Sequence, residues 1–195
     1  MLTCGLDEVG TGCLAGPIVS AAVALPLDLR EWPLPGVRDS KKTTLRQREK
    51  VVDEICAYVD RMGGWIGIGL VEVEEINRMG HGAAVQLSYA RAVREVCLFA
   101  RPKLLIVDGN VGVSGYPSRQ LIEARADSRY FTVAAASMVA KRYRDLLMDD
   151  LAQAHPLYEW GKNHGYGTPE HVAALRKHGM SPLHREQASS TALRA

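Results

Sequence analysis

The sequence predicts an α/β domain built on a mixed central β-sheet flanked by helices. Two observations predict this class: apolar runs of strand length open the chain, and further apolar runs then alternate with amphipathic helical stretches. The chain has 195 residues, within the range of one domain, and 47% of them are hydrophobic, enough to bury a core. Internal repeats and low-complexity segments are absent from the sequence.

The chain is expected to begin with two strands and a loop. Residues 2–6 form the first strand and residues 16–25 the second, because "GPIVSAAVAL" is a nearly continuous apolar run. Residues 26–40 contain four prolines or glycines and are expected to form a loop. A helix over 44–60 and a third strand over 65–73 follow.

The middle of the chain predicts a helix and two strands. The helix is expected over 82–98, with one apolar face formed by Ala83, Leu87, Ala90, Val93 and Cys97. "KLLIVDGN" (103–110) predicts a buried strand that ends at Asp108 and Gly109. A further short strand is expected near 120–125.

The C-terminal third is expected to be helical. A long helix runs from about Thr132 to Gln153, with an apolar stripe of Ala136, Val139, Ala140, Tyr143, Leu147 and Leu151. A last helix begins at Thr168 and Pro169, since threonine caps well and proline suits the first turn. The tail after about residue 185 has few anchors, and we expect it to fray.

The composition indicates a protein of a reducing compartment. An apolar run of about 18 residues, the length that crosses a membrane, is absent, and so is a secretion signal, so we expect a cytoplasmic location. Cys4, Cys13, Cys56 and Cys97 are widely spaced, which favours buried free thiols over zinc ligands or disulfides.

The net charge of +2 is too small to indicate nucleic-acid binding by itself. Basic residues are instead concentrated in segments 39–50, 140–145 and 176–178. Such segments are usually solvated faces, and they support a binding function only where they flank a catalytic cleft.

Two adjacent acids directly follow the first predicted strand. Asp7 and Glu8 follow apolar residues and precede Gly10 and Gly12. Burying an unpaired charge costs several kcal/mol, so this pair indicates a strand end that meets solvent. Neighbouring side chains on a regular strand face opposite ways, and both acids can serve one site only if the backbone twists or bulges there.

Two further acids occupy positions suited to the same site. Asp108 follows four apolar residues and precedes a glycine, and Asp127 lies between the short strand and the long helix. Asp108 taken alone is explained as a turn-forming Asp-Gly pair, and Asp127 as a helix cap or a partner of the helix dipole. The set of four acids is harder to explain in this way.

Clustered carboxylates repel one another unless a cation offsets their charge. Hard oxygen ligands suit Mg²⁺ or Mn²⁺. Two such ions about 4 Å apart can activate water and stabilise the leaving oxygen in phosphoryl transfer. A serine–histidine pair and a Walker-type loop are absent, and "GTG" is too short for a dinucleotide fingerprint.

The chain resembles the type 2 ribonucleases H, the ribonuclease HII family, from about residue 4 to Arg185. The resemblance rests on an ordered set of segments: "GLDEVGTGCLAGPIVSAAVAL", "DSKK", "LLIVDGN", "AAASMVAKRYRD" and "HGYGTPEH". It implies a ribonuclease H-like catalytic domain over 1–154 and a helical C-terminal extension over 155–195 packed on the same domain.

The resemblance also implies an activity and a metal site. Members cleave the RNA strand of RNA–DNA hybrids and nick duplex DNA on the 5′ side of an embedded ribonucleotide. Four carboxylates hold two Mg²⁺ or Mn²⁺ ions when substrate is bound, and they correspond here to Asp7, Glu8, Asp108 and Asp127. The products carry 3′-hydroxyl and 5′-phosphate ends, and the enzyme is expected to act as a monomer.

Ribose recognition is implied for two segments. A Gly-Arg-Gly segment and a C-terminal tyrosine read the 2′-hydroxyl in the family, and they correspond here to Gly10, Thr11, Gly12 and Tyr166. Thr11 departs from the usual arginine, and the loss of a charged hydrogen bond is worth about 1.5–3 kcal/mol. We therefore expect weaker binding or a changed balance between hybrid and single-ribonucleotide substrates.

Phosphate contacts are expected from Lys42, Lys141 and Arg144, although a solvated helix face explains the last two equally well. His164 and His171 are candidate proton donors, but lone histidines are more often core or surface residues. Two alternatives stay open: another nuclease of the same fold, such as a junction resolvase or a type 1 ribonuclease H, and a nucleic-acid-binding module without catalysis.

Overall fold

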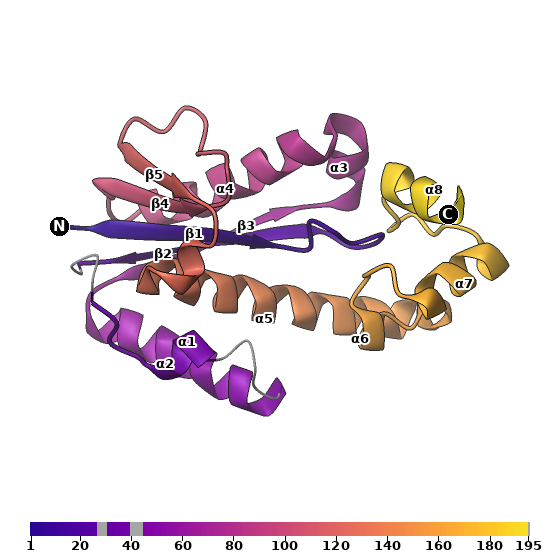
Figure 1. The fold of residues 1–195 in the computed structure, drawn as a ribbon, viewed down its shortest axis with the longest axis horizontal. Coiled ribbons are helices and arrows are strands. Elements are labelled where there is room, and N and C mark those ends of the chain that lie inside the picture. The colour runs from indigo at the N-terminus through magenta and orange to yellow at the C-terminus, as the bar shows by residue number, and fades with distance from the viewer. Residues whose placement is uncertain (27–30, 40–44, 195) are drawn as a thin grey trace.

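A five-stranded mixed sheet forms the centre of the molecule, in the order β3-β2-β1-β4-β5 (Figure 1). The computed structural model describes residues 1–26, 31–39 and 45–194. The strands are β1 (Thr3–Val9), β2 (Ile18–Leu25), β3 (Trp65–Val71), β4 (Leu104–Asp108) and β5 (Arg119–Glu123). The pairs β1–β2 and β2–β3 are antiparallel, whereas β1–β4 and β4–β5 are parallel. The predicted α/β class with a mixed sheet is confirmed.

Helices cover both faces of this sheet (Figure 1). One face carries α1 (Gly36–Asp39), α2 (Leu45–Arg61) and α5 (Phe131–Ala154), and the other carries α3 (Val73–Met79) and α4 (His81–Cys97). A short 3₁₀ turn, η2 (Ala126–Ser128), precedes α5. The chain ends in η3 (Pro156–Tyr158), α6 (Trp160–Asn163), α7 (Pro169–His178) and α8 (Glu186–Arg194), which gather beyond one end of the sheet (Figure 1).

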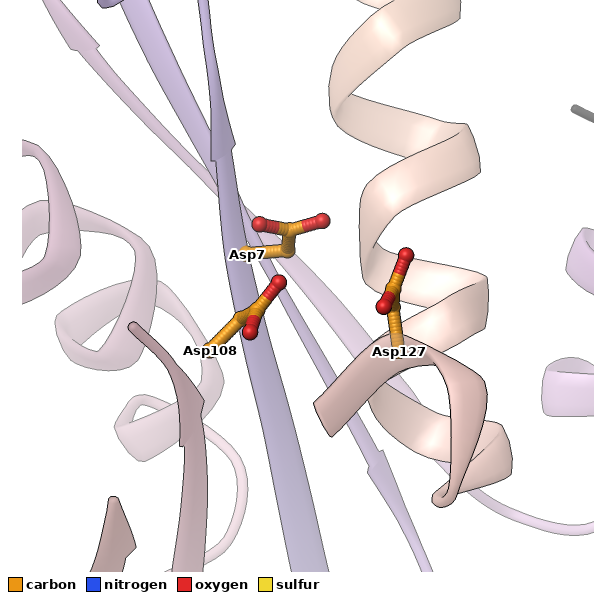
Figure 2. Close-up of side chains that lie close together, drawn as sticks. All are labelled: Asp7, Asp108 and Asp127. Carbon is orange, nitrogen blue, oxygen red and sulfur yellow. The ribbon is translucent and has the colours of Figure 1, made fainter. Parts of the chain in front are cut away.

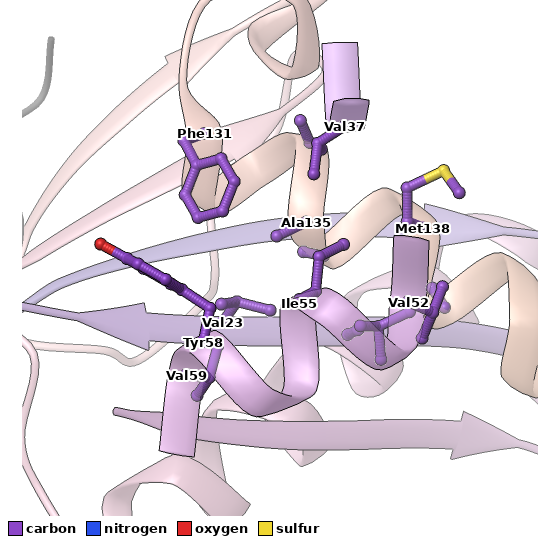
Figure 3. Packing of buried hydrophobic residues seen from close by; sticks show 14 of the residues in the cluster. Val23, Val37, Val52, Ile55, Tyr58, Val59, Phe131, Ala135 and Met138 are labelled. Atoms are coloured by element: carbon purple, nitrogen blue, oxygen red, sulfur yellow. The ribbon is translucent and has the colours of Figure 1, made fainter. Parts of the chain in front are cut away.

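The fully buried β2 explains the continuous apolar run in the sequence. Alternate residues of β2 face opposite layers, so Val23 packs with Ile55 and Phe131 in the α2–α5 layer (Figure 3). Ala22 packs in the α4 layer together with Tyr89. A strand buried on both sides cannot show polar alternation.

Helix α5 crosses β1 in direct backbone contact at Gly5. A side chain at Gly5 would place its Cβ 2.3 Å from the backbone carbon of Thr132, so only glycine fits. This contact brings the start of α5, and η2 before it, against the strand that carries Asp7. The close approach therefore sets where Asp127 lies.

Two of the predicted helix faces are confirmed in part, and each contains residues that are not buried. The fully buried residues of α4 are Ala84, Ser88, Tyr89, Ala92, Val93 and Val96. Of the predicted face, Val93 is buried, Leu87, Ala90 and Cys97 pack against the core as partly buried side chains, and Ala83 is exposed. Polar groups on this face pair internally, as the 2.6 Å hydrogen bond between the Ser20 and Ser88 hydroxyls shows. On α5, Tyr143 is 41% exposed, and the neighbouring Arg144 is buried instead.

Three other segments differ from expectation. The third strand ends at Val71, because Glu72 caps α3, and the expected loop contains the single turn of α1. The tail does not fray but forms α8, whose buried Ser189 donates a hydrogen bond to the Leu14 carbonyl (3.1 Å). Cys56 is exposed rather than buried, and Cys4, Cys13, Cys56 and Cys97 are all free thiols.

Within the described ranges, none of the helices combines the length and the apolar character that a membrane crossing requires.

Candidate active site

Three aspartates from distant parts of the chain meet at one edge of the sheet. Each of Asp7, Asp108 and Asp127 offers a carboxylate oxygen, and these oxygens all lie within 4.8 Å of one another. Figure 2 shows the three side chains pointing toward a common space between β1, β4 and the start of α5.

Strand topology explains the convergence. The parallel strands β1 and β4 pair from Thr3 with Leu104 to Leu6 with Val107, so Asp7 and Asp108 follow side by side at the same strand ends. Asp108 is fixed there because its Oδ1 accepts a hydrogen bond from the Ala126 backbone N–H (3.0 Å). This bond also ties β4 to η2, the turn that carries Asp127.

Glu8 lies on the opposite face of β1 from Asp7. The ladder with β2 continues regularly through Glu8 and Val9, so the strand has no bulge at this point, and of the two conditions under which both acids could serve one site only a twist of the backbone is left. The Glu8 carboxylate accepts a hydrogen bond from the Tyr89 hydroxyl of α4, which also donates to the Asp108 carbonyl (3.2 Å). Tyr89 thus fixes Glu8 beside β4.

The electrostatics of the site indicate an uncompensated negative charge. Burial raises the pKa of Asp7 to about 7, and the charges of Glu8 and Asp108 act in the same direction, whereas a hydrogen bond with Ser137 opposes the shift. Burial likewise raises the pKa of Glu8, against the hydrogen bond from Tyr89. The converging carboxylate oxygens and the raised pKa of Asp7 fit a divalent cation, because a cation would favour the ionised form of that carboxyl.

The glycine-rich segment after β1 is held by a buried arginine from the far end of the chain. Gly10 adopts a φ of +87°, and a Cβ there would lie 2.2 Å from Nε of Arg144. Arg185, only 3% exposed, donates from Nη1 to the carbonyls of Gly10 (2.6 Å) and Thr11 (3.3 Å). The same side chain also donates to the carbonyls of Gly16 and Pro17.

Tyr166 lies directly beside this segment. Cys13 and Tyr166 form an isolated antiparallel bridge, and the Leu14 N–H donates to the Gly165 carbonyl (2.8 Å). The Tyr166 side chain is 38% exposed, and the Arg144 guanidinium carbon lies 5.8 Å from its ring centroid. The structure therefore brings together Tyr166 and the segment from Gly10 to Gly12.

The predicted phosphate contact of Arg144 is wrong. Its side chain is fully buried, and it donates to the carbonyls of Pro17 (3.0 Å), His164 (2.9 Å) and Ala15 (3.1 Å). A guanidinium with these partners is not available to a substrate at the surface. Lys141 is partly exposed and pairs with Asp145 on the same helix, and Lys42 lies outside the described residues.

The two histidines considered as proton donors have structural partners. His164 is partly buried next to Asp149, with 3.3 Å between Nε2 and Oδ1. His171 is fully buried and hydrogen-bonds Tyr166, Trp160 and His184.

Sequence reasoning missed two residues of the site, Tyr89 and Arg185. Tyr89 lies in an otherwise apolar helix and looks like a core aromatic until its hydroxyl partner is known. For Arg185 a signal existed, because a histidine and an arginine stand together in a tail with few other anchors.

The mixed sheet and the aspartates gathered at its edge are those of metal-dependent nucleases with a ribonuclease H-like fold. The sequence model of the ribonuclease HII family matches residues 4–190, and the chain belongs to this family. It is therefore a metal-dependent ribonuclease H enzyme.

Individual relatives agree in sequence and in fold. The chain is 41% identical over 181 residues to a ribonuclease HII of Thermosynechococcus vestitus. The aligned region covers 93% of this chain and 80% of the relative. The ribonuclease H2 structure from Pyrococcus horikoshii matches with a TM-score of 0.77 and 25% identity, over 100% of this chain and 98% of that one. Bst-RNase HIII, solved in complex with Mn²⁺, shares the fold (TM-score 0.72, 21% identity, 100% of this chain and 70% of that one).

Proposed function

We propose that this ribonuclease H hydrolyses the RNA strand of RNA–DNA hybrids and also nicks duplex DNA on the 5′ side of an embedded ribonucleotide. The observation that carries the proposal is the convergence of the Asp7, Asp108 and Asp127 carboxylates within 4.8 Å. Family membership supports the class of substrate. Hydrolysis of the P–O3′ bond would leave a 3′-hydroxyl and a 5′-phosphate.

The acids would hold two Mg²⁺ or Mn²⁺ ions when substrate is bound, with Glu8 as the fourth ligand. Such ions activate the attacking water and stabilise the leaving oxygen. The protein keeps the ligands in place before substrate arrives: Ser137 hydrogen-bonds Asp7, and Tyr89 holds Glu8. This preorganisation keeps the carboxylates from turning away from one another.

Ribose reading is proposed for Gly10, Thr11, Gly12 and Tyr166. The glycines leave main-chain groups open to a 2′-hydroxyl, and a tyrosine can stack on a sugar and hydrogen-bond through its hydroxyl. A groove lined by residues of this segment and of α8, among them Thr11 and Gln187, lies next to it. Because the segment follows β1 directly, Gly10, Thr11 and Gly12 share one continuous stretch of chain with the first two acids, Asp7 and Glu8.

Lys141 and Lys42 stay our candidates for phosphate contacts, and Lys141 would exchange its partner Asp145 for a phosphate. Such contacts would make the affinity fall with rising salt. The cytoplasmic location and the monomeric state stay predictions.

The decisive experiment uses duplex DNA with a single ribonucleotide, incubated with Mg²⁺ or Mn²⁺, and maps the nick. The wild-type protein is expected to cut on the 5′ side of the ribonucleotide. Asp108→Asn is expected to abolish the nick, because it removes the negative charge but little volume. Its remaining amide oxygen can still accept from the Ala126 N–H, so the variant should unfold at no lower temperature than the wild-type protein.

Other products would overturn the proposal. Cutting of duplexes that lack a ribose would indicate a different nuclease of this fold, such as a junction resolvase. Cleavage of hybrids without nicking at a single ribonucleotide would indicate the substrate range of a type 1 ribonuclease H. Binding without cleavage under both metals would indicate a catalytically silent nucleic-acid-binding module.

A further inference from the structure

A buried polar cluster lies behind the segment that carries Tyr166. It contains Trp160, His171, His184 and Ser181, and the first three side chains are at most 1% exposed. None of these residues touches the three aspartates through a hydrogen bond recorded among the described residues. The cluster therefore needs an explanation other than metal binding.

The hydrogen-bond partners fix the direction of every bond at His171. Its Nδ1 lies 2.8 Å from the Tyr166 carbonyl oxygen, which can only accept, so Nδ1 carries the proton. The Trp160 indole N–H donates to Nε2 of His171 (3.1 Å), so this second nitrogen is an acceptor. His171 is therefore a neutral imidazole that donates to Tyr166.

His184 extends the chain of bonds in the same direction. Its Nε2 lies 3.1 Å from the acceptor nitrogen of His171 and, as a donor, shares the single lone pair of that nitrogen with the Trp160 N–H. Its Nδ1 accepts from the Ser181 backbone N–H (2.9 Å). Burial, which lowers the pKa of both imidazoles, agrees with these neutral forms. The bonds thus run from Ser181 through both rings to the Tyr166 carbonyl.

The Tyr166 side chain is 38% exposed, and hydrogen bonds hold its main chain on both sides. The carbonyl accepts from the Thr168 N–H (2.9 Å) as well as from His171, and the N–H donates to the Asn163 carbonyl (2.9 Å). Among these partners, only His171 contributes a side chain from another element, the first turn of α7. Its imidazole therefore couples the position of Tyr166 to the packing of the C-terminal helices.

We propose that His171 is a positioning residue that sets the Tyr166 ring against the substrate ribose through its Nδ1–H bond. The inference rests on the proposed role of Tyr166 in reading the ribose. His171 itself touches no substrate in this arrangement, and its effect passes through the main chain of residue 166.

Variants of His171 separate this role from simple packing. His171→Asn places an amide N–H near the position of Nδ1 and is expected to keep most of the activity. His171→Gln places its amide where Nε2 lies, and it is expected to lower kcat/KM on the single-ribonucleotide duplex roughly tenfold, the size expected for one lost buried hydrogen bond at a positioned group. Equal activities of the Asn and Gln variants would overturn the inference.

Tyr158→Phe is the matched control. Tyr158 stacks on Trp160 in the same cluster and donates to the Gly179 carbonyl (3.0 Å), without a hydrogen bond to Tyr166. It is expected to lose stability as His171→Gln does while keeping the wild-type kcat/KM. A loss of activity in step with the loss of stability in both variants would reduce His171 to a packing residue.

A double-mutant cycle with Tyr166→Ala distinguishes the inference from the proposed function. Tyr166→Ala alone tests the ribose role, and full activity of that variant would overturn both. If Tyr166→Ala is impaired, His171→Gln is expected to cost nothing further in its background. An equal loss in both backgrounds would overturn the role of His171 and leave that of Tyr166 in place.

Discussion

Two polar regions of this enzyme differ in what their charged side chains face. At the sheet edge, the carboxylates of Asp7, Asp108 and Asp127 face one another, and burial raises the pKa of Asp7 to about 7. Around the glycine-rich segment, Arg144 and Arg185 are equally buried, but their donors meet main-chain carbonyls. In the second region main-chain carbonyls meet the charged donors, whereas the first gathers like charges, an arrangement that fits a bound cation.

Removing a charge from the sheet edge should have the largest effect. Asp7→Asn is expected to lower cleavage by more than the roughly 10–100-fold that the loss of an outer-shell partner costs. In a metal chelator at pH 8 the same variant should unfold at a higher temperature than the wild-type protein, because it no longer buries a repelled carboxylate. Cleavage rates and thermal melts check both statements. An equal or lower melting temperature in chelator would contradict the account of the sheet edge.

Removing one of the two buried arginines beside the glycine-rich segment, Arg144, should have the opposite effect on stability. Arg144→Met leaves three carbonyls without their donor and is expected to lower the free energy of unfolding by about 3 kcal/mol or more. Arg142→Met, on the same helix, is the control: Arg142 is partly exposed and pairs with Asp53, so its loss should cost at most about 1 kcal/mol. Denaturant titration measures both, and similar losses would show that burial of the guanidinium does not matter.

The pH dependence of stability separates the two ends of the molecule. Burial lowers the pKa of His184 from 6.5 to about 4. Its contribution to the free energy of unfolding is therefore lost as the pH drops below 6.5, because the unfolded state then takes up a proton that the folded state does not. The pKa of Asp7 rises from 3.8 to about 7, so in the metal-free protein its contribution is lost as the pH rises through that range. The slopes oppose each other over the same window.

Thermal melts from pH 4 to pH 7 resolve these two slopes. Saturating Mn²⁺ should favour ionised Asp7 and leave the rise of stability with pH that the buried imidazoles of His184 and His171 cause. His184→Gln should make that rise smaller. Identical profiles with and without the metal would contradict the assignment of Asp7.

The smallest effect is expected at the surface of the glycine-rich segment. Thr11 is half-buried, and its carbonyl is held by Arg185, so a new side chain there should leave the main chain unchanged. Thr11→Arg adds a donor for a phosphate and is expected to tighten binding or shift the preference between hybrid and single-ribonucleotide substrates by about tenfold or less. Unchanged affinities and an unchanged ratio would remove the idea that Thr11 matters.

The sheet was predictable from the sequence because buried strands need apolar runs. Helix faces were less predictable, since α4 buries Ser88 and Tyr89, whose polar groups find partners only in the folded protein. The division into 1–154 and 155–195 stays a prediction, although Met148 of α5 and Leu14 pack in one cluster with Trp160 and Leu175.

The four acids could be singled out because a carboxylate at the end of an apolar strand is costly without a function. The geometry that unites three of them was not visible, since it depends on the close contact at Gly5 and on the strand order. Arg144 was assigned to the surface because a basic helical segment usually faces solvent. The sequence alone does not show that main-chain carbonyls surround the Arg144 side chain.

The bond between Arg185 and Gly10 has a consequence for how the enzyme comes into being. During synthesis, the first strand and the glycines after it leave the ribosome early, long before residue 185 has been translated. The Gly10 carbonyl can accept the Cys13 N–H (3.3 Å) early, whereas Arg185 reaches the carbonyls of Gly10 and Thr11 only after residue 185 has been translated. A nascent polypeptide can therefore carry every acid of the sheet edge before the segment at Gly10 and Thr11 has gained its arginine.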